Sequence, residues 1–174
     1  MQPFQKTLAR CAIRPFRKGD EPELWRHADD PDVARNLRDR FPSPYTLTDA
    51  EGWVRETLEQ RPLTNFAITV DDRVVGAVGF MVGQDIHRRS AEIGYWLGRA
   101  YWGRGLATEA LIAVSEHAFA RHDLARLYAG VLPWNPASER VLVKAGYTLE
   151  ARMRSAATKG GHTVDELLYA RVRA

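Results

Sequence analysis

Cysteine is nearly absent from this sequence, since Cys11 is the only one among 174 residues. A single cysteine excludes an internal disulfide and a zinc site built from several thiolates. Long hydrophobic runs are also missing, because no stretch reaches the roughly 18 uninterrupted apolar residues that a membrane span needs. The N-terminus lacks the apolar core of a secretory signal. We therefore expect a cytoplasmic protein without a membrane partner.

Dense runs of lysine and arginine are missing too, although 25 basic and 22 acidic residues leave a formal net charge of +3. This balance argues against a nucleic-acid partner and suits an anionic small ligand. The five histidines lack the spacing of metal ligands. We therefore expect no metal ion.

Repeats, low-complexity tracts and linker-like changes in composition are absent as well. A chain of 174 residues is long enough to bury one sizeable core. We expect a single domain over residues 1–174, with residues 1–10 as a loose N-terminal tail.

Hydrophobic periodicity predicts strands and helices that alternate along the chain. An α+β (or α/β) domain with a mixed, mainly antiparallel sheet follows from their order. Val74, Val78, Phe80 and Val82 are expected to share one face of their strand. The strands are expected at 11–16, 65–70, 73–82, 91–97, 125–132, 147–154 and 164–172. The helical segments are expected at 21–37, interrupted between Asp30 and Pro31, at 49–60 behind a Thr48–Glu51 capping box, at 105–120, and at 135–146 between Asn135 and Gly146.

The stretch "YWGRGLATEAL" at 101–111 places two glycines directly before a helix. Free N–H groups and the positive end of a helix make an anion site, and glycine lets the backbone approach a phosphate. A plain turn is the alternative. The sequence lacks the lysine of a nucleoside triphosphate loop and the third glycine of a dinucleotide fingerprint.

Two segments resemble one known family. "EIGYWLGRAYWGRGLATEAL", followed about 25 residues later by "NPASERVLVKAGY", resembles the GNAT superfamily of acetyl-CoA-dependent N-acetyltransferases. Within it, the likeness is to the RimJ/RimL type, which acetylates protein N-terminal amines. The resemblance covers residues 11–172 in element order and 91–147 in motif detail.

The resemblance implies a GNAT fold, flanked by helices, whose sheet splays between the fourth and fifth expected strands, 91–97 and 125–131. The pantetheine arm of acetyl-CoA would lie in that gap. The pyrophosphate loop maps to 102–107, where Trp102 departs from the family's glutamine or arginine. The implied coenzyme-binding residues are Trp96, Leu97, Trp102, Gly103, Arg104, Gly105, Leu106, Ala107, Thr108, Asn135, Ser138 and Lys144. Arg99 and Arg140, like Arg104 and Lys144, are candidates for the coenzyme phosphates, with a solvated surface as the alternative for any one of the four.

Glu92 resembles the strand-borne glutamate that several family members use as a base, and a solvated edge residue is its alternative. Ser138 matches the asparagine-x-x-serine motif of the branch and would assist the leaving thiolate. Many relatives have a tyrosine seven residues after the asparagine, but Leu142 occupies that position here. A backbone N–H near Leu97 would meet the oxyanion.

The expected activity is acetyl transfer to a primary amine, first of all a protein or peptide N-terminal α-amine, by direct attack in a ternary complex. The loops 36–46 and 155–166 are expected to border the acceptor, with Arg38 and Tyr45 as candidate contacts. An amino sugar, a polyamine or an amino-acid-like metabolite is the alternative acceptor. A non-catalytic coenzyme A-binding module and a nucleotide-binding protein that uses residues 98–108 are the rival functions. A homodimer is suggested by analogy.

Overall fold

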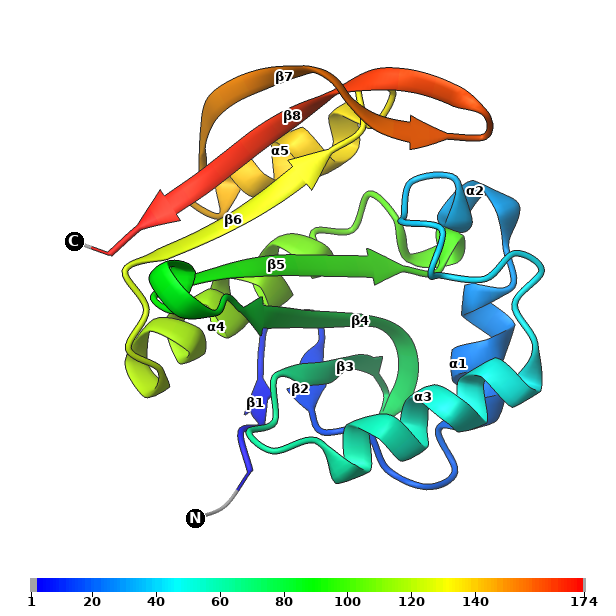
Figure 1. Cartoon of the computed structure of the whole chain (residues 1–174). Helices are drawn as coiled ribbons and strands as arrows, with labels where there is room; N and C mark the ends of the chain where they lie inside the picture. Colours follow the sequence, from blue (N-terminus) through cyan, green and yellow to red (C-terminus); the bar gives the residue numbers. More distant parts are fainter. Residues whose placement is uncertain (1–2, 174) are drawn as a thin grey trace.

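The structure, a computed structural model, describes residues 3–173. Its centre is an eight-stranded sheet in the order β1-β2-β3-β4-β5-β6-β8-β7 (Figure 1). Within the described residues, every neighbouring pair is antiparallel except β5 and β6. The strands are β1 Lys6–Thr7, β2 Ala12–Arg14, β3 Asn65–Val70, β4 Arg73–Val82, β5 Ser90–Leu97, β6 Arg126–Val131, β7 Thr148–Lys159 and β8 His162–Val172.

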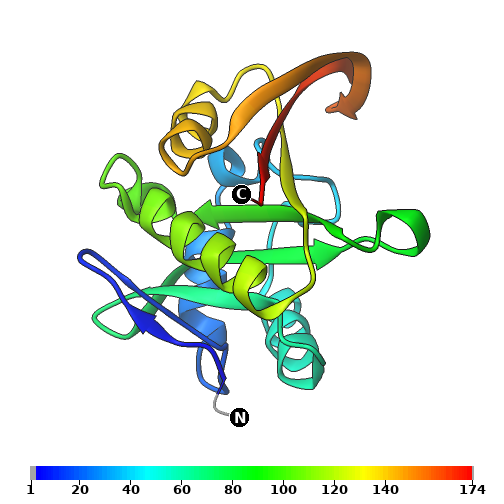
Figure 2. The same ribbon diagram turned by 90° about the vertical axis from the view of Figure 1, so that its left-hand side faces the viewer.

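Helices cover both faces of the sheet (Figure 2). The long helix α4, Leu106–Arg121, and α5, Pro136–Lys144, pack on one side with the larger hydrophobic cluster. Helices α1, Glu21–Ala28, and α3, Leu47–Glu59, pack on the opposite side with a smaller cluster. The short helix α2, Pro31–Ala34, follows α1 directly, so the interruption expected at Pro31 is confirmed.

The sheet opens between β5 and β6. These strands pair only where Ser90–Glu92 lies beside Arg126–Tyr128, and beyond Glu92 they diverge (Figure 1). We call this opening the fork. The predicted splay between these two strands is therefore confirmed, and beyond Glu92 the backbone groups of β5 on this side have no partner in β6.

The N-terminal segment differs from the expected loose tail. Lys6–Thr7 pair with Ala12 and Ile13 as β1. The ring of Phe4 stacks on His117 with centroids 4.0 Å apart and meets Phe66 edge-on at 5.3 Å. The expectation is wrong for residues 3–10 because this aromatic contact anchors the segment on α4; residues 1–2 lie outside the described residues.

Helix α3 begins two residues earlier than expected. Thr46 and Asp49 form its capping box, and Asp49 accepts hydrogen bonds from both the N–H and the hydroxyl of Thr46. The predicted pair, Thr48 and Glu51, has the same spacing. The pattern alone could not separate the two.

The prediction that Val74, Val78, Phe80 and Val82 share one face of β4 is wrong for Val74. The register between β3 and β4 shifts where Ile68 and Thr69 face Gly76 and Val74. Such a bulge reverses the alternation of side chains. Val74 therefore packs in the cluster with α1 and α3, whereas Val78 and Phe80 pack in the cluster with α4.

The expected loop over 155–166 is largely strand. Strands β7 and β8 extend to Lys159 and from His162, and Gly160 and Gly161 make the turn with φ of 58° and 79°. The polar composition concealed the pairing. Among residues 3–173 there is no helix with the length and apolarity that crossing a membrane requires.

Candidate active site

The glycine loop joins the end of β5 to the start of α4. Gly103 and Gly105 have φ of +72° and +79°, the left-handed region that favours glycine. Gly105 is the N-cap of α4 and has no side chain to bond the first N–H groups of the helix. The local sequence therefore leaves those N–H groups available to an anion.

A cavity of about 360 Å³ adjoins this loop. Five of the predicted coenzyme-binding residues line it: Gly103, Arg104, Gly105, Thr108 and Lys144. The guanidinium of Arg104 also lies 5.2 Å from the ring centroid of Tyr101. Sequence reasoning missed two further lining residues, Arg10 and Glu109. These two residues are 99 positions apart in the chain, so only the folded structure shows that they lie together at this cavity.

The other predicted residues of the loop act differently. Leu106 is buried in the core, and the partly buried Ala107 packs against it, so Leu106 can contribute to a ligand site only through its backbone. The indole Nε1 of Trp102 donates a hydrogen bond to the carbonyl of Leu97 over 2.8 Å. Trp102 thus ties the loop to the end of β5, a role that its departure from the family pattern did not indicate.

The backbone of β5 presents alternate residues to the fork. The N–H of Gly98 donates to the carbonyl of Val75 over 2.8 Å, which makes this pair a hydrogen-bonded one. Bonded and non-bonded pairs alternate along an antiparallel ladder. Trp96 therefore faces β4 with its backbone, while Tyr95 and Leu97 face the fork. The backbone of Leu97, and not that of Trp96, therefore faces the fork, so a backbone contact with the coenzyme fits Leu97 of these two predicted residues.

A hydrogen bond at the fork joins a side chain of β5 to one of α5. The hydroxyls of Tyr95 and Ser138 lie 2.7 Å apart. Burial raises the pKa of Tyr95, so it remains a neutral hydroxyl. Asn135 accepts from the N–H of Ser138 over 3.2 Å and caps α5, which fixes the serine at the start of the helix. Leu142, at the position where relatives have a tyrosine, is fully buried.

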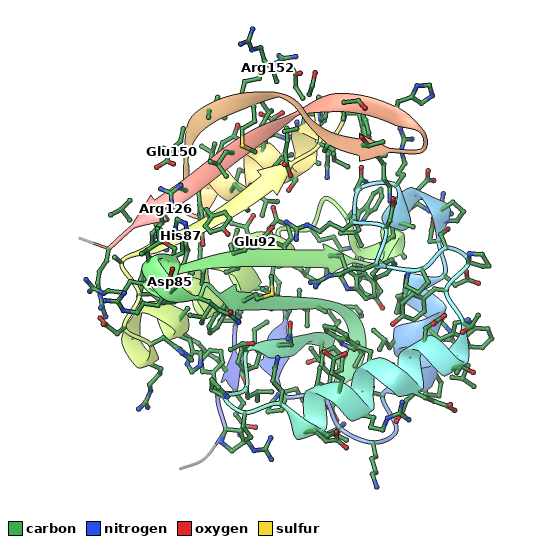
Figure 3. The ribbon with its side chains drawn as sticks, in the orientation of Figure 1. Asp85, His87, Glu92, Arg126, Glu150 and Arg152 are labelled. Carbon is green, nitrogen blue, oxygen red and sulfur yellow. The ribbon has the colours of Figure 1, made fainter. Side chains whose placement is uncertain are left out.

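Two carboxylates and an arginine lie at the fork on the other face of the sheet, opposite to Tyr95 and Ser138. Glu92 extends from β5 beside the fork (Figure 3) and is ion-paired with Arg38. Glu166 comes from β8, and a Cβ on Gly130 would lie 2.1 Å from its Oε1, so its carboxyl rests on β6. Burial raises the pKa of Glu166; Arg38 lowers it and Glu92 raises it further. The structure thus brings together Arg38 and Glu92, which were predicted separately as site residues, and adds Glu166.

Three predicted residues lie elsewhere. Tyr45 is 6% exposed, and burial raises its pKa to about 12, so the predicted substrate contact is not supported. Arg99 is ion-paired with Asp30 at 2.9 Å and Asp32 at 3.0 Å instead of facing the loop. Arg140 lines a second cavity, of about 230 Å³, together with Trp102 and Asn135.

Comparison with known proteins identifies the family. Residues 10–148 match the family described as "Acetyltransferase (GNAT) domain". The chain is 29% identical over 164 residues to uncharacterized N-acetyltransferase p20 of Bacillus licheniformis, covering 92% of this chain and 91% of that protein. It is 31% identical over 107 residues to the ribosomal-protein-serine acetyltransferase of Escherichia coli (strain K12), covering 62% and 59%.

A solved structure agrees with this result. Mycobacterium smegmatis RimJ in complex with CoA-disulfide superposes with a TM-score of 0.85 at 27% identity, covering 98% of this chain and 88% of that chain. The two chains thus share one fold over nearly the whole length of this chain. The chain belongs to the GNAT family of acetyltransferases and is an N-acetyltransferase that uses acetyl-CoA as its acetyl donor.

Proposed function

We propose that this enzyme acetylates the N-terminal α-amine of a protein or peptide by direct attack in a ternary complex. The ribosomal-protein-serine acetyltransferase and RimJ are relatives that support this choice. The observation that carries the proposal is the position of Glu92, a carboxylate on β5 at the fork. It lies on the sheet face opposite to the one where Tyr95 meets Ser138.

The coenzyme side of the proposal uses the glycine loop. The first N–H groups of α4, with Arg104, Thr108 and Lys144, would hold the diphosphate in the cavity that they line. The pantetheine arm would run along β5 and bond the backbone of Tyr95 and Leu97. The N–H of Leu97 would also meet the oxyanion that forms on the thioester carbonyl.

The acceptor side uses the face that carries Glu92. A Cβ on Gly94, the next residue but one, would have no heavy atom within 4 Å, so the surface of β5 is open there. An α-amine has a pKa of about 7.7–8.0, so about a tenth of it is neutral at pH 7. A carboxylate that accepts the proton through a water is therefore a sufficient base.

The hydroxyl of Ser138 would assist the leaving group. The amine nitrogen bonds to the thioester carbon, the C–S bond breaks, and the thiolate of coenzyme A leaves. A thiol has a pKa of about 8.5, so a hydroxyl is a poor acid beside it. Ser138, held by Asn135 and by Tyr95, would instead donate a hydrogen bond that orients the sulfur.

The test compares acceptors by the pKa of their amines. Short peptides with either the α-amine or the lysine side chain blocked, and spermidine, are assayed from pH 6.5 to 9 by release of free thiol from acetyl-CoA. Near pH 7 well under 0.1% of a lysine amine is neutral. We expect α-amine peptides to react faster. If lysine-only peptides or spermidine react faster at pH 7, a small-molecule or side-chain amine is the acceptor instead.

A further inference from the structure

The cavity at the glycine loop contains an ion pair whose two members come from distant parts of the chain. Arg10 lies in the turn between β1 and β2, and Glu109 in the first turn of α4. Nη1 of Arg10 is 2.5 Å from Oε1 of Glu109, and the N–H of Arg10 donates to Oε2 over 3.0 Å. One carboxylate is therefore bonded twice by the same residue, which fixes the turn against the helix.

Arg10 reaches the loop itself. A Cβ on Gly105 would lie 3.8 Å from Nη1 and 3.9 Å from Cζ of Arg10. The side chain of Arg10 is 61% exposed, whereas that of Glu109 is 18% exposed. The guanidinium thus adjoins the glycine backbone and can turn toward an anion in the cavity, while Glu109 is held beneath it.

The charged groups that line this cavity have opposite effects on the binding of an anion. The N-terminus of α4, Arg104 and Lys144 favour an anion, but the carboxylate of Glu109 repels one. Guanidinium groups bind carboxylate and phosphate with the same forked geometry, so the two anions compete for Arg10. The pair is therefore suited to adjust how tightly phosphate is bound.

We propose that Arg10 binds the diphosphate of coenzyme A and that Glu109 positions this arginine while weakening the binding of the phosphates. The inference rests on the proposed assignment of the coenzyme to the glycine loop. It predicts that the two members of one ion pair affect coenzyme affinity in opposite directions.

The experiment measures acetyl-CoA affinity by calorimetric titration of the full chain and its variants. Arg10→Gln should weaken binding about tenfold, because a hydrogen bond between charged groups is lost. Glu109→Gln should tighten it about threefold or more, because a like charge is removed. Glu116→Gln is the matched control: its pair with Lys6, 3.4 Å long, joins the same hairpin to α4 but does not line the cavity.

A purely structural role for the pair predicts another result. If the pair only fastens the hairpin, Arg10→Gln and Glu109→Gln weaken binding alike, and the proposal is overturned. Should Arg10→Gln be unstable, the ratio of KM for acetyl-CoA to KM for S-acetylpantetheine, which lacks phosphates, still decides. That ratio rises only if Arg10 contacts a phosphate.

A second variant separates this proposal from the assignment of the coenzyme to the glycine loop. If Gly105→Glu leaves acetyl-CoA binding intact, the loop assignment fails. If Gly105→Glu abolishes binding while Arg10→Gln has no effect, only this proposal fails.

Discussion

Replacing Glu92 with glutamine separates its chemical role from its structural one. The exchange preserves size and hydrogen bonding but removes the charge that pairs with Arg38. Arg38 is 59% exposed, so the pair contributes only about 0.2–1 kcal/mol to stability. In a domain of this size 1 kcal/mol corresponds to roughly 2–4 °C. We therefore expect a melting temperature within about 4 °C of the unaltered protein.

The catalytic effect should be much larger. A positioned general base contributes about 10²–10⁴ in rate, and 10² corresponds to about 2.7 kcal/mol. We expect Glu92→Gln to lower kcat by roughly 100-fold or more, with acetyl-CoA affinity unchanged. Thiol release with an α-amine peptide at pH 7 measures the rate, and calorimetry measures the affinity.

The matched control is Arg38→Gln, which breaks the same ion pair from the other side. It should change KM for the acceptor more than kcat, because Arg38 lies beside the base without accepting the proton. A Glu92→Gln variant with near-normal kcat would refute the assignment of the base. Equal losses of kcat in both variants would mean that the ion pair, and not the carboxylate, is what matters.

Three further variants test other parts of the site and the fold. Gly105→Glu should abolish acetyl-CoA binding in calorimetry; the left-handed backbone adds about 1–2 kcal/mol of strain, so the fold should persist, and unchanged affinity would contradict the loop assignment. Gly94→Val should raise KM for the acceptor without altering acetyl-CoA affinity, since the space above this residue is open; an unchanged KM would show that the acceptor does not approach there. Burial beneath Phe4, with smaller effects of His122 and Arg121, lowers the pKa of His117 to about 4. Because the unfolded chain binds this proton near pH 6.5, stability should fall as pH drops from about 6.5 toward 4, and melting curves of His117→Phe should lose that part of the pH dependence.

The parts of the site that sequence predicted are those encoded locally. Gly103 and Gly105 lie two residues apart, and each can adopt its positive φ because glycine has no side chain, which the sequence alone shows. Asn135 precedes Pro136 and caps the helix that follows it. The fork, by contrast, came from the family resemblance, because nothing in strands 91–97 or 125–131 states where their pairing ends.

The residues that sequence reasoning missed belong to pairs distant in the chain. Arg10 lay in a segment expected to be loose, and Glu166 lay where the expected loop 155–166 overlaps the expected strand 164–172. Packing also decides what sequence could not show for two candidates: Tyr45 is buried, and Asp30 and Asp32 hold Arg99. A local sequence pattern can predict a loop or a helix cap, but only the folded structure shows which charged side chains surround it.

The fork also gives the sheet two inner edges in addition to its outer ones, and these edges can be followed by amide hydrogen exchange. In the protein without coenzyme, the N–H groups of Tyr95 and Leu97 face the gap, whereas those of Gly94 and Trp96 point into the ladder with β4. Protection should therefore alternate from one residue to the next. A pantetheine arm along β5 would slow exchange at the two gap-facing amides only, so protection along this strand would become uniform when the coenzyme is bound.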